Sequence, residues 1–387
     1  MNLTKIINLG MHPYADTFVP EQFFAKSEPV HPLQCGLDEE TGHVMLMYLT
    51  DPVERYNLYP YSYTSSNSKI AKNHWVDFAS STHQKLGLKE EDFVVEIGSN
   101  DGFLTAEYMK LGCEALGIDP SHSMAVEAAK LGVTTKCTVF CEASSHKVEK
   151  KATLVVANNV FNHANDPIDF ALGVRNILKD EGTFVFQVPY WLNTIKDRKF
   201  DQIYHEHPSY FTVKSARNLL KKAGLYVYDV EWYDYHGGSI RVFASRQERE
   251  VTQAVKDHIA QEEEEGLFTL ERYESFMSDI SHERNTFLSK LYALKTEGKS
   301  IVAIGAAAKG NTFLNYYNLD RSVIDYVTDM SDHKVGKYTP LSRIPIDTDD
   351  EVFSQYENVY AIVLSWNISD LIKSKLKDIN PNITFIQ

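Results

Sequence analysis

Short apolar runs alternate with helical patterns through the middle of this 387-residue chain, and this alternation restricts its fold more than any other feature. Between residues 92 and 245 the apolar runs read FVVEIG, EALGID, ATLVVANNV, GTFVFQV and SIRVFAS. Strands that alternate with helices build a parallel or mostly parallel sheet with both faces covered. A second alternation begins with SIVAIG near residue 300, so we predict an α/β protein with two sheet-containing units.

The chain divides into four parts on this basis. Residues 1–85 are rich in Pro, Tyr and short polar turns, residues 86–245 hold the first α/β unit, and residues 299–387 hold the second. The polar residues 246–298 between the units predict two connecting helices, of which the second carries an amphipathic stripe. We expect the glutamate run in QEEEEG to be a solvated helix face.

Composition excludes several kinds of partner. The net charge of −14 argues against nucleic acid, because phosphate binding needs clustered Lys and Arg. No apolar run approaches the ~20 residues of a membrane span, and the N-terminus lacks the apolar core of a signal peptide. Four cysteines in so long a chain do not make a disulfide framework. We therefore expect a cytoplasmic protein with neither a membrane nor a nucleic acid as partner.

The first candidate site lies in DFVVEIGSNDGFL, residues 92–104, where a buried strand ends in Glu96 and a glycine-rich turn leads into a helix. Glycines let the backbone approach a ligand closely, and Asp119 at the next strand end suits the two hydroxyls of a ribose. The G-x-x-x-G spacing departs from the dinucleotide pattern. Glu96 would repel a pyrophosphate but suits a cation, which favours S-adenosylmethionine over NAD as cofactor.

The next strand adds polar groups at the same edge of the sheet. It ends in LVVANNVFNHANDP, which contributes two asparagines and His163, and GTFVFQVPY brings Gln187 to this edge. The candidate cofactor-binding residues are Glu96, Gly98, Ser99, Asn100, Gly102, Asp119, Asn158 and Asn159.

The stretch FDQIYHEHPSYF, residues 200–211, places two histidines around a glutamate. A metal site needs several ligands that converge on one ion. In an extended segment His205 and His207 would share a face and Glu206 would oppose them, which leaves only two ligands. A polar surface turn and an acid–base cluster are the other interpretations, and we favour proton chemistry because histidine titrates near neutrality.

Taken together, these motifs resemble those of a known family, the S-adenosylmethionine-dependent C-methyltransferases that act on nucleotide-linked 4-keto-deoxysugars. The resemblance spans nearly the whole chain through INLGMHPYADTF, YPYSYTSSNS, EIGSNDG, YHEH, HGGSIRVF, GAAAKGNTFLNYY and VLSWN. It implies a class I methyltransferase Rossmann-like domain, a second C-terminal Rossmann-like domain, and a small N-terminal segment. It also implies a nucleotide-linked sugar as substrate.

The family places the YHEH motif in the active site, where a base removes a proton beside a ketone to give an enolate. The resemblance therefore implies that His207 is the base, that Tyr204 and Glu206 position the substrate or tune the base, and that His163 lies nearby. The candidate catalytic residues are His207, Tyr204, Glu206, His163 and Tyr63. The candidate substrate-binding residues are Tyr61, His205, His236, Lys309, Asn311, Asp329 and Lys337.

The stretch GAAAKGNT, residues 305–312, superficially matches a phosphate-binding P-loop. Asn311 occupies the position of the essential lysine, so we reject a nucleotide hydrolase. The turn still precedes a helix whose N-terminus can hold an anion, with Lys309 adding charge. A structural unit that binds no ligand is the alternative.

Family members usually begin with a zinc module built from four cysteines, and this chain departs from that pattern. Asp38 and Thr41 stand where the second cysteine pair is expected, and Cys35 alone cannot hold zinc. We expect no metal, and a trimmed module held by packing.

We therefore expect an enzyme that methylates a carbon of a nucleotide-linked keto-sugar. Two alternatives stay open: methylation of oxygen or nitrogen on a related small molecule, and a non-catalytic protein that binds a sugar nucleotide or the cofactor.

Overall fold

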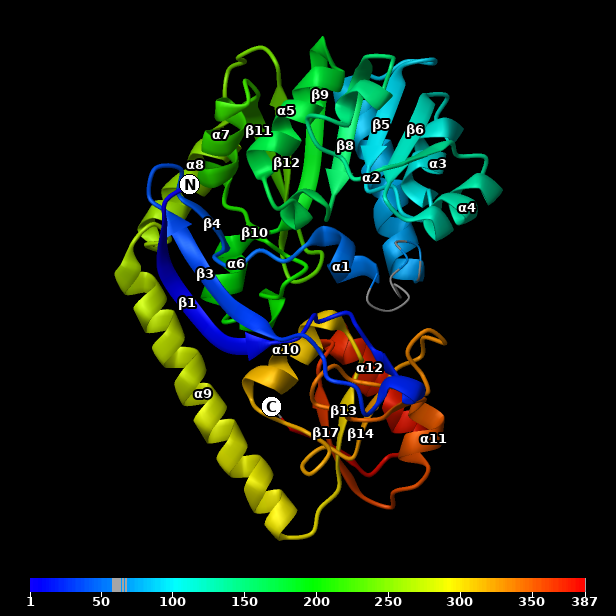
Figure 1. Cartoon of the computed structure of the whole chain (residues 1–387), viewed down its shortest axis with the longest axis vertical. Coiled ribbons are helices and arrows are strands. Elements are labelled where there is room, and N and C mark those ends of the chain that lie inside the picture. Colours follow the sequence, from blue (N-terminus) through cyan, green and yellow to red (C-terminus); the bar gives the residue numbers. More distant parts are fainter. Residues whose placement is uncertain (58–63, 65, 67, 387) are drawn as a thin grey trace.

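The computed structural model describes residues 1–57, 64, 66 and 68–386. The three larger sheets of the described residues are distributed along the longest axis in Figure 1. A seven-stranded sheet lies at the top, a four-stranded sheet built mainly from the N-terminal part lies at the left, and a five-stranded C-terminal sheet lies at the bottom. Within the described part of the chain, no helix is both long and apolar enough to cross a membrane.

The seven-stranded sheet has the order β11-β12-β9-β8-β5-β6-β7. Strands β5 to β9 pair in parallel, whereas β12 pairs antiparallel with both β9 and β11. This confirms the predicted mostly parallel sheet. The strands are β5 (Phe93–Ile97), β6 (Glu114–Asp119), β7 (Thr135–Cys137), β8 (Ala152–Asn158), β9 (Leu178–Pro189), β11 (Tyr226–Tyr233) and β12 (Ser239–Ser245).

Helices cover both faces of this sheet. The helices of this unit are α2 (Lys69–Leu86), α3 (Phe103–Lys110), α4 (His122–Lys130), α5 (Pro167–Ile177), α6 (Trp191–Lys196) and α7 (Val213–Lys222), of which α6 lies below the sheet in Figure 1. Successive residues of β5 face opposite sides: Val94 packs with Trp75 and Phe78 of α2, whereas Val95 belongs to the cluster that contains Phe170 of α5. The alternation follows from the two-residue period of a strand.

The C-terminal sheet has the order β16-β14-β13-β17-β18, with every pair parallel. Its strands are β13 (Ile301–Ile304), β14 (Tyr326–Thr328), β16 (Ile346–Asp347), β17 (Val359–Val363) and β18 (Ile383–Ile386), and its helices are α10 (Ala308–Tyr316), α11 (Asp349–Phe353) and α12 (Ser369–Ile379). This is the second α/β unit that the sequence predicts.

The N-terminal part joins the other two units. Its strands β1 (Leu3–His12), β3 (His31–Asp38) and β4 (His43–Leu46) form an antiparallel sheet with β10 (Ser209–Tyr210) from the following unit. A second pairing links β2 (Val19–Pro20) to β15 (Lys337–Tyr338) of the C-terminal unit. The short helix α1 (Pro52–Asn57) follows β4.

Two helices connect the large sheets, as the sequence predicts: α8 (Gln253–Glu264) and the long α9 (Leu270–Thr296), which runs down the left edge of Figure 1. The apolar stripe on α9 is buried at Tyr273, Phe276, Ile280, Phe287 and Leu291. The glutamate run is not wholly solvated, because Glu262 is fully buried. The expectation of a solvated glutamate face is therefore wrong at this position.

Hydrogen bonds hold the N-terminal sheet at Asp38 and Thr41, where the sequence resemblance leads us to expect the loss of a cysteine pair. The buried carboxylate of Asp38 accepts hydrogen bonds from the Thr41 hydroxyl (2.5 Å), the Thr41 amide (3.2 Å) and the Asn2 amide (3.1 Å). These bonds close the turn between β3 and β4 and attach the start of β1 to it.

We expect Asp38→Ala to lower the free energy of unfolding by about 1–3 kcal/mol, because it leaves buried donors without an acceptor. Urea unfolding measures this, and Glu39→Ala, on the exposed neighbour, is the control. A chelator should leave the wild-type midpoint unchanged, and metal analysis that finds one zinc per chain would contradict this account.

Candidate active site

The glycine-rich turn after β5 is held against the end of β6. The amides of Gly98 and Ser99 both donate to the Ile118 carbonyl, and the Asp119 carboxylate accepts from the amides of Asn100 (2.9 Å) and Ser121 (2.8 Å). Gly98 has a φ of +72°, and a Cβ there would lie 2.1 Å from Val160. Only glycine therefore fits this close approach of backbone and side chain.

Acidic groups gather at this edge of the sheet. Glu96 is buried and accepts a hydrogen bond from the Thr105 hydroxyl. Burial raises its pKa to about 8, and the charges of Asp101 and Asp119 add to the effect. Burial also raises the pKa of Asp119. A cation bound here would relieve this mutual repulsion, so the edge suits a positively charged ligand.

The asparagines that follow β8 lie at the same edge. The side-chain oxygen of Asn158 accepts from the Gln187 amide (3.0 Å), and the Asn159 amide donates to the Gln187 carbonyl (2.8 Å). The Asn158 amide nitrogen and the Asn159 side-chain oxygen are buried, and neither has a hydrogen-bond partner within the described residues. Both atoms are therefore available to a ligand.

The residues around the His-Glu-His motif form a turn rather than an extended strand. The His207 amide donates to the Tyr204 carbonyl (2.9 Å), and the chain reverses at His205 and Glu206. The expectation that His205 and His207 share a face is therefore wrong. His207 packs against Tyr204, whereas His205 is buried between Tyr14 and His31.

His207 has a defined tautomer. Its Nδ1 lies 3.3 Å from the Gln202 carbonyl, and its Nε2 lies 2.8 Å from the Tyr204 hydroxyl. A carbonyl only accepts, so Nδ1 carries the proton and Nε2 accepts from the hydroxyl. The His163 ring packs edge-on against His207 with centroids 4.8 Å apart, so the structure brings these three candidate catalytic residues together.

Burial lowers the pKa of His207 to about 3; the Gln202 carbonyl opposes this shift and Arg55 adds to it. The pKa of His163 is also lowered by burial and by the neighbouring His207. Both rings are therefore uncharged at neutral pH, so the expectation of a histidine that titrates near neutrality is wrong for these two residues as the structure has them.

Glu206 binds the N-terminal part of the chain rather than the His207 ring. Its carboxylate accepts from the amides of Ala15 (3.2 Å) and Asp16 (2.9 Å), and burial raises its pKa to about 7. The Asn311 side chain donates to the Ala15 carbonyl (2.6 Å) and is itself buried. The loop after β1 thus contacts both side chains. We expected Glu206 to position the substrate or tune the base, and Asn311 to bind the substrate.

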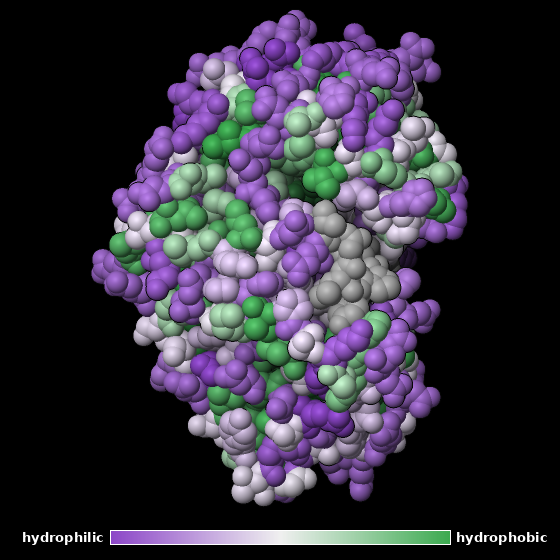
Figure 2. Space-filling view, viewed as in Figure 1, coloured by the Kyte–Doolittle hydropathy of each residue, from purple (hydrophilic) through white to green (hydrophobic). Residues whose placement is uncertain are grey.

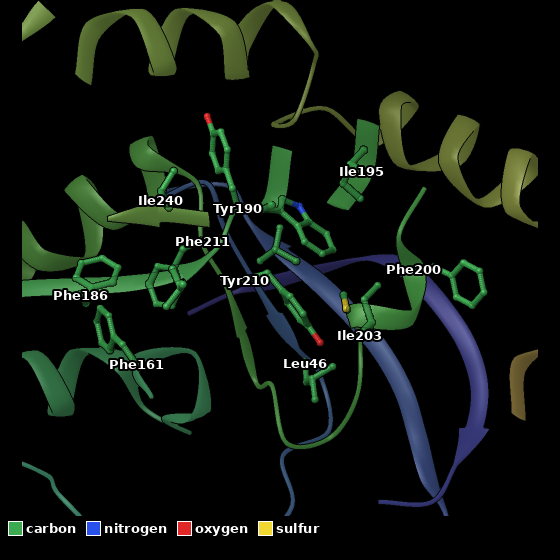
Figure 3. Close-up of a cluster of buried hydrophobic side chains, with 14 of the residues drawn as sticks. Leu46, Phe161, Phe186, Tyr190, Ile195, Phe200, Ile203, Tyr210, Phe211 and Ile240 are labelled. Atoms are coloured by element: carbon green, nitrogen blue, oxygen red, sulfur yellow. The ribbon is translucent and has the colours of Figure 1, made fainter. Parts of the chain in front are cut away.

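Apolar side chains anchor the segment that carries the motif. Figure 3 shows Phe200, Ile203, Tyr210 and Phe211 of this segment within one buried cluster. Phe211 stacks on Phe161 with ring centroids 4.8 Å apart. The apolar residues of the segment therefore fix its backbone, and the contacts of Glu206 add to this anchoring.

The C-terminal unit contributes a lysine to the same region. Lys309 donates to the Asn367 side chain, and its Nζ lies 3.9 Å from the centre of the Trp366 ring. Burial lowers the pKa of Lys309 to about 8, while Asp201 opposes the shift. Lys199 lies 5.0 Å from the same ring, and the Trp366 indole donates to Asp201 (2.7 Å).

The remaining substrate-binding candidates are spread over this interface. Gly237 and Gly238 form the predicted turn between β11 and β12, with φ of +83° and +106°, and the His236 carbonyl accepts from the Gln202 side chain (3.0 Å). Asp329 lies 3.7 Å from Lys334, and Lys337 lies in β15. Tyr61 and Tyr63 lie outside the described residues.

Sequence reasoning missed a chain of buried polar groups beside this site. The Gln187 side-chain oxygen accepts from Arg241 (3.2 and 3.3 Å), and its nitrogen lies 2.8 Å from Nε2 of His74. His74 stacks on Tyr235 at a centroid distance of 3.7 Å. The motif HGGSIRVF contains Arg241, but nothing local in it signals this partner. Lys199, Asp201 and Trp366 were missed for the same reason.

Comparisons with known proteins agree with this architecture. A methyltransferase domain model matches residues 71–230, and a C-methyltransferase C-terminal domain model matches residues 234–386. The chain is 29% identical over 382 residues to C-methyltransferase NovU of Streptomyces niveus. The matched region covers 97% of this chain and 90% of that protein.

Solved structures give weaker likenesses. Magnesium protoporphyrin IX methyltransferase of Synechocystis PCC 6803 with bound SAH has a TM-score of 0.39 at 15% identity, over 46% of this chain and 88% of that one. An S-adenosylmethionine-dependent methyltransferase of Clostridium acetobutylicum ATCC 824 has a TM-score of 0.38 at 15% identity, over 50% of this chain and 95% of that one.

The two family models define the class: an enzyme with a Rossmann-like methyltransferase domain and a C-terminal parallel α/β domain, whose cofactor is S-adenosylmethionine. More particularly, the chain is an S-adenosylmethionine-dependent C-methyltransferase and a distant homologue of NovU. The predictions of the fold class, the enzyme and the cofactor are confirmed. Carbon is therefore preferred to oxygen or nitrogen as the methyl acceptor, and the non-catalytic alternative is set aside.

Glu262 of α8 contacts the residues directly after the segment that carries the His-Glu-His motif. Its carboxylate accepts from the Tyr190 hydroxyl (2.8 Å) and from the amides of Val213 (2.6 Å) and Lys214 (3.0 Å) at the start of α7. Figure 3 shows Tyr190 pointing out of the aromatic cluster, with its hydroxyl at the far end. One buried carboxylate thus joins α8, the end of β9 and the start of α7.

We expect Glu262→Gln to lower the free energy of unfolding by about 1–3 kcal/mol, because an amide nitrogen would then face a buried backbone N–H. Glu263→Gln is the matched control, since Glu263 makes only a surface ion pair with Lys214. Urea unfolding compares the two variants, and equal stabilities would refute the role assigned to Glu262.

Proposed function

We propose that the enzyme methylates a carbon next to the ketone of a nucleotide-linked keto-deoxysugar, through an enolate formed by His207. The observation that carries this proposal is the environment of His207: an uncharged ring, fixed by the Gln202 carbonyl, with Nε2 directed at the Tyr204 hydroxyl. The sugar substrate rests on the sequence resemblance, and the homology to C-methyltransferase NovU supports a carbon acceptor.

The acidic edge of the seven-stranded sheet is our proposed cofactor site. Asp119 would accept hydrogen bonds from the ribose, the turn at Gly98 would allow close approach, and Glu96 would balance the positive charge. The unpartnered atoms of Asn158 and Asn159 suit the polar ends of the ligand. When bound, S-adenosylmethionine supplies the electrophilic methyl group.

Proton removal follows from the geometry of His207. Nε2 takes the proton from the carbon beside the ketone, and the electron pair of that C–H bond passes into the enolate. The Tyr204 hydroxyl, released from Nε2, then donates to the developing oxyanion. His163 packs against the base and keeps its ring in place.

The substrate would lie between the methyltransferase domain and the C-terminal domain. Lys199 and Lys309, which both lie near the Trp366 ring, would supply positive charge for a diphosphate, and the turn at His236 would close that side. Asp329 and Lys337 would complete the proposed pocket, and the sequence resemblance alone assigns Tyr61 and Tyr63 to it. Residues 1–85, 86–245, 246–298 and 299–387 would then act as the substrate-framing, methyl-transfer, connecting and nucleotide-closing parts.

We expect Asp119→Asn to weaken S-adenosylmethionine binding by about 10- to 100-fold, because hydrogen bonds to a charged acceptor contribute ~1.5–3 kcal/mol. Isothermal calorimetry measures the affinity. Glu114→Gln, at the opposite end of the same strand, is the control and should bind normally. Unchanged affinity in Asp119→Asn would remove this residue from the site.

We expect His207→Ala to lower turnover by roughly 10²–10⁴ while cofactor affinity stays near that of the wild type, because general-base catalysis contributes about this much. The assay uses labelled S-adenosylmethionine with a panel of nucleotide-linked keto-deoxysugars. Solvent deuterium should enter the carbon beside the ketone with wild-type enzyme and not with the variant.

His146→Ala is the control, because this exposed histidine lies on the surface of the same domain. Full turnover or continued deuterium exchange in His207→Ala would exclude this residue as the base. Loss of cofactor binding in that variant would point to a structural role instead.

A further inference from the structure

A groove of about 620 Å³ lies between α9 and the C-terminal sheet. Figure 2 shows hydrophobic atoms gathered in the lower half of this face, where α9 and the C-terminal domain meet. The volume falls within the range of small-molecule sites, roughly 300–1,000 Å³.

The groove exists because one face of the C-terminal sheet is only partly covered. Ala361 packs on the α12 side with Leu376, whereas Ile362 points to the other face and joins the cluster that contains Leu314 of α10. Ile362 and Ile386, from β17 and β18, both line the groove beside α10. Helix α9 forms the opposite wall.

Several aromatic rings line this space. Phe287 comes from α9, Phe313 and Tyr317 come from α10, and Trp366 follows β17. Phe313 and Tyr317 stack with centroids 4.2 Å apart, and Phe287 lies edge-on to both. Such walls favour a flat ring that stacks or packs edge-on.

The charged side chains that line the groove carry a net positive charge. Lys290 of α9 and Lys373 of α12 both line it, and among the described residues neither forms an ion pair. The ammonium of Lys373 lies 5.7 Å from the centre of the Phe385 ring, which also lines the groove. The acidic residue of the lining, Glu283, pairs with Arg198 (2.5 Å) and is therefore already neutralised.

Trp366 separates this groove from the proposed substrate pocket. Its indole N–H donates to Asp201, and a Cβ on Gly237 would lie 2.5 Å from its ring, so the indole is held tightly on that side. The groove therefore adjoins the methyl-transfer site but has its own walls.

We propose that this groove binds a small aromatic anion, at a site separate from those of the methyl donor and the nucleotide-linked sugar. The aromatic walls take the ring, and Lys290 and Lys373 take the negative group. The inference does not depend on the identity of the sugar or on His207.

The test uses 8-anilinonaphthalene-1-sulfonate, an aromatic sulfonate that fluoresces when bound in an apolar site, with the full-length protein. We expect one saturable site per chain. The double variant that combines Lys290→Glu with Lys373→Glu should bind the probe at least ~10-fold more weakly than the wild type does. The control pair Lys299→Glu and Lys377→Glu makes the same change of net charge on exposed residues outside the groove, and it should bind like the wild type.

Competition separates this site from its neighbours. S-adenosylmethionine and a nucleoside diphosphate should each leave the probe bound. Displacement by the nucleoside diphosphate would overturn the proposal, because the groove would then belong to the substrate pocket. Equal weakening by both lysine pairs, or no saturable binding, would also overturn it.

Discussion

The structure depends on the burial of one segment, residues 200–212, where the three large parts of the chain meet. Its apolar side chains Phe200, Ile203, Tyr210 and Phe211 belong to the main core, and full burial of such side chains contributes roughly 1.5–3 kcal/mol each. Because the backbone is fixed in this way, each polar side chain has a defined direction. Glu206 binds the N-terminal loop and Asp201 binds Trp366 of the C-terminal domain.

The same burial sets the electrostatics of the site. It keeps His207 and His163 uncharged at neutral pH and raises the pKa of Glu96, so the acidic edge favours a bound cation. A cation bound at the acidic edge would add to the cost of an imidazolium nearby. The proposed base would therefore need a bound substrate that stabilises its imidazolium form, because an efficient general base titrates near the working pH.

Local patterns in the sequence predicted most of the fold and only part of the site. Strand and helix positions follow from apolar periodicity, and the turn at Gly98 follows from its glycines. The partners of buried polar groups do not, because they come from distant parts of the chain: Asn311 donates to Ala15, and Glu262 accepts from Val213. The sequence did not predict the turn at His205 either. The packing of the apolar residues on both sides of the turn fixes its shape, rather than the residues within it.

The N-terminal sheet is fixed by a buried carboxylate at the positions where the sequence resemblance leads us to expect lost zinc ligands. The Asp38 carboxylate links the turn between β3 and β4 to the start of β1 through neutral donors. Such bonds are weaker than metal ligation, so the sheet needs further support. It obtains this support from β10, which pairs with β4, and from the amides of Ala15 and Asp16 on Glu206. The segment that carries the proposed base therefore also stabilises the N-terminal sheet, and the N-terminal sheet in turn stabilises this segment.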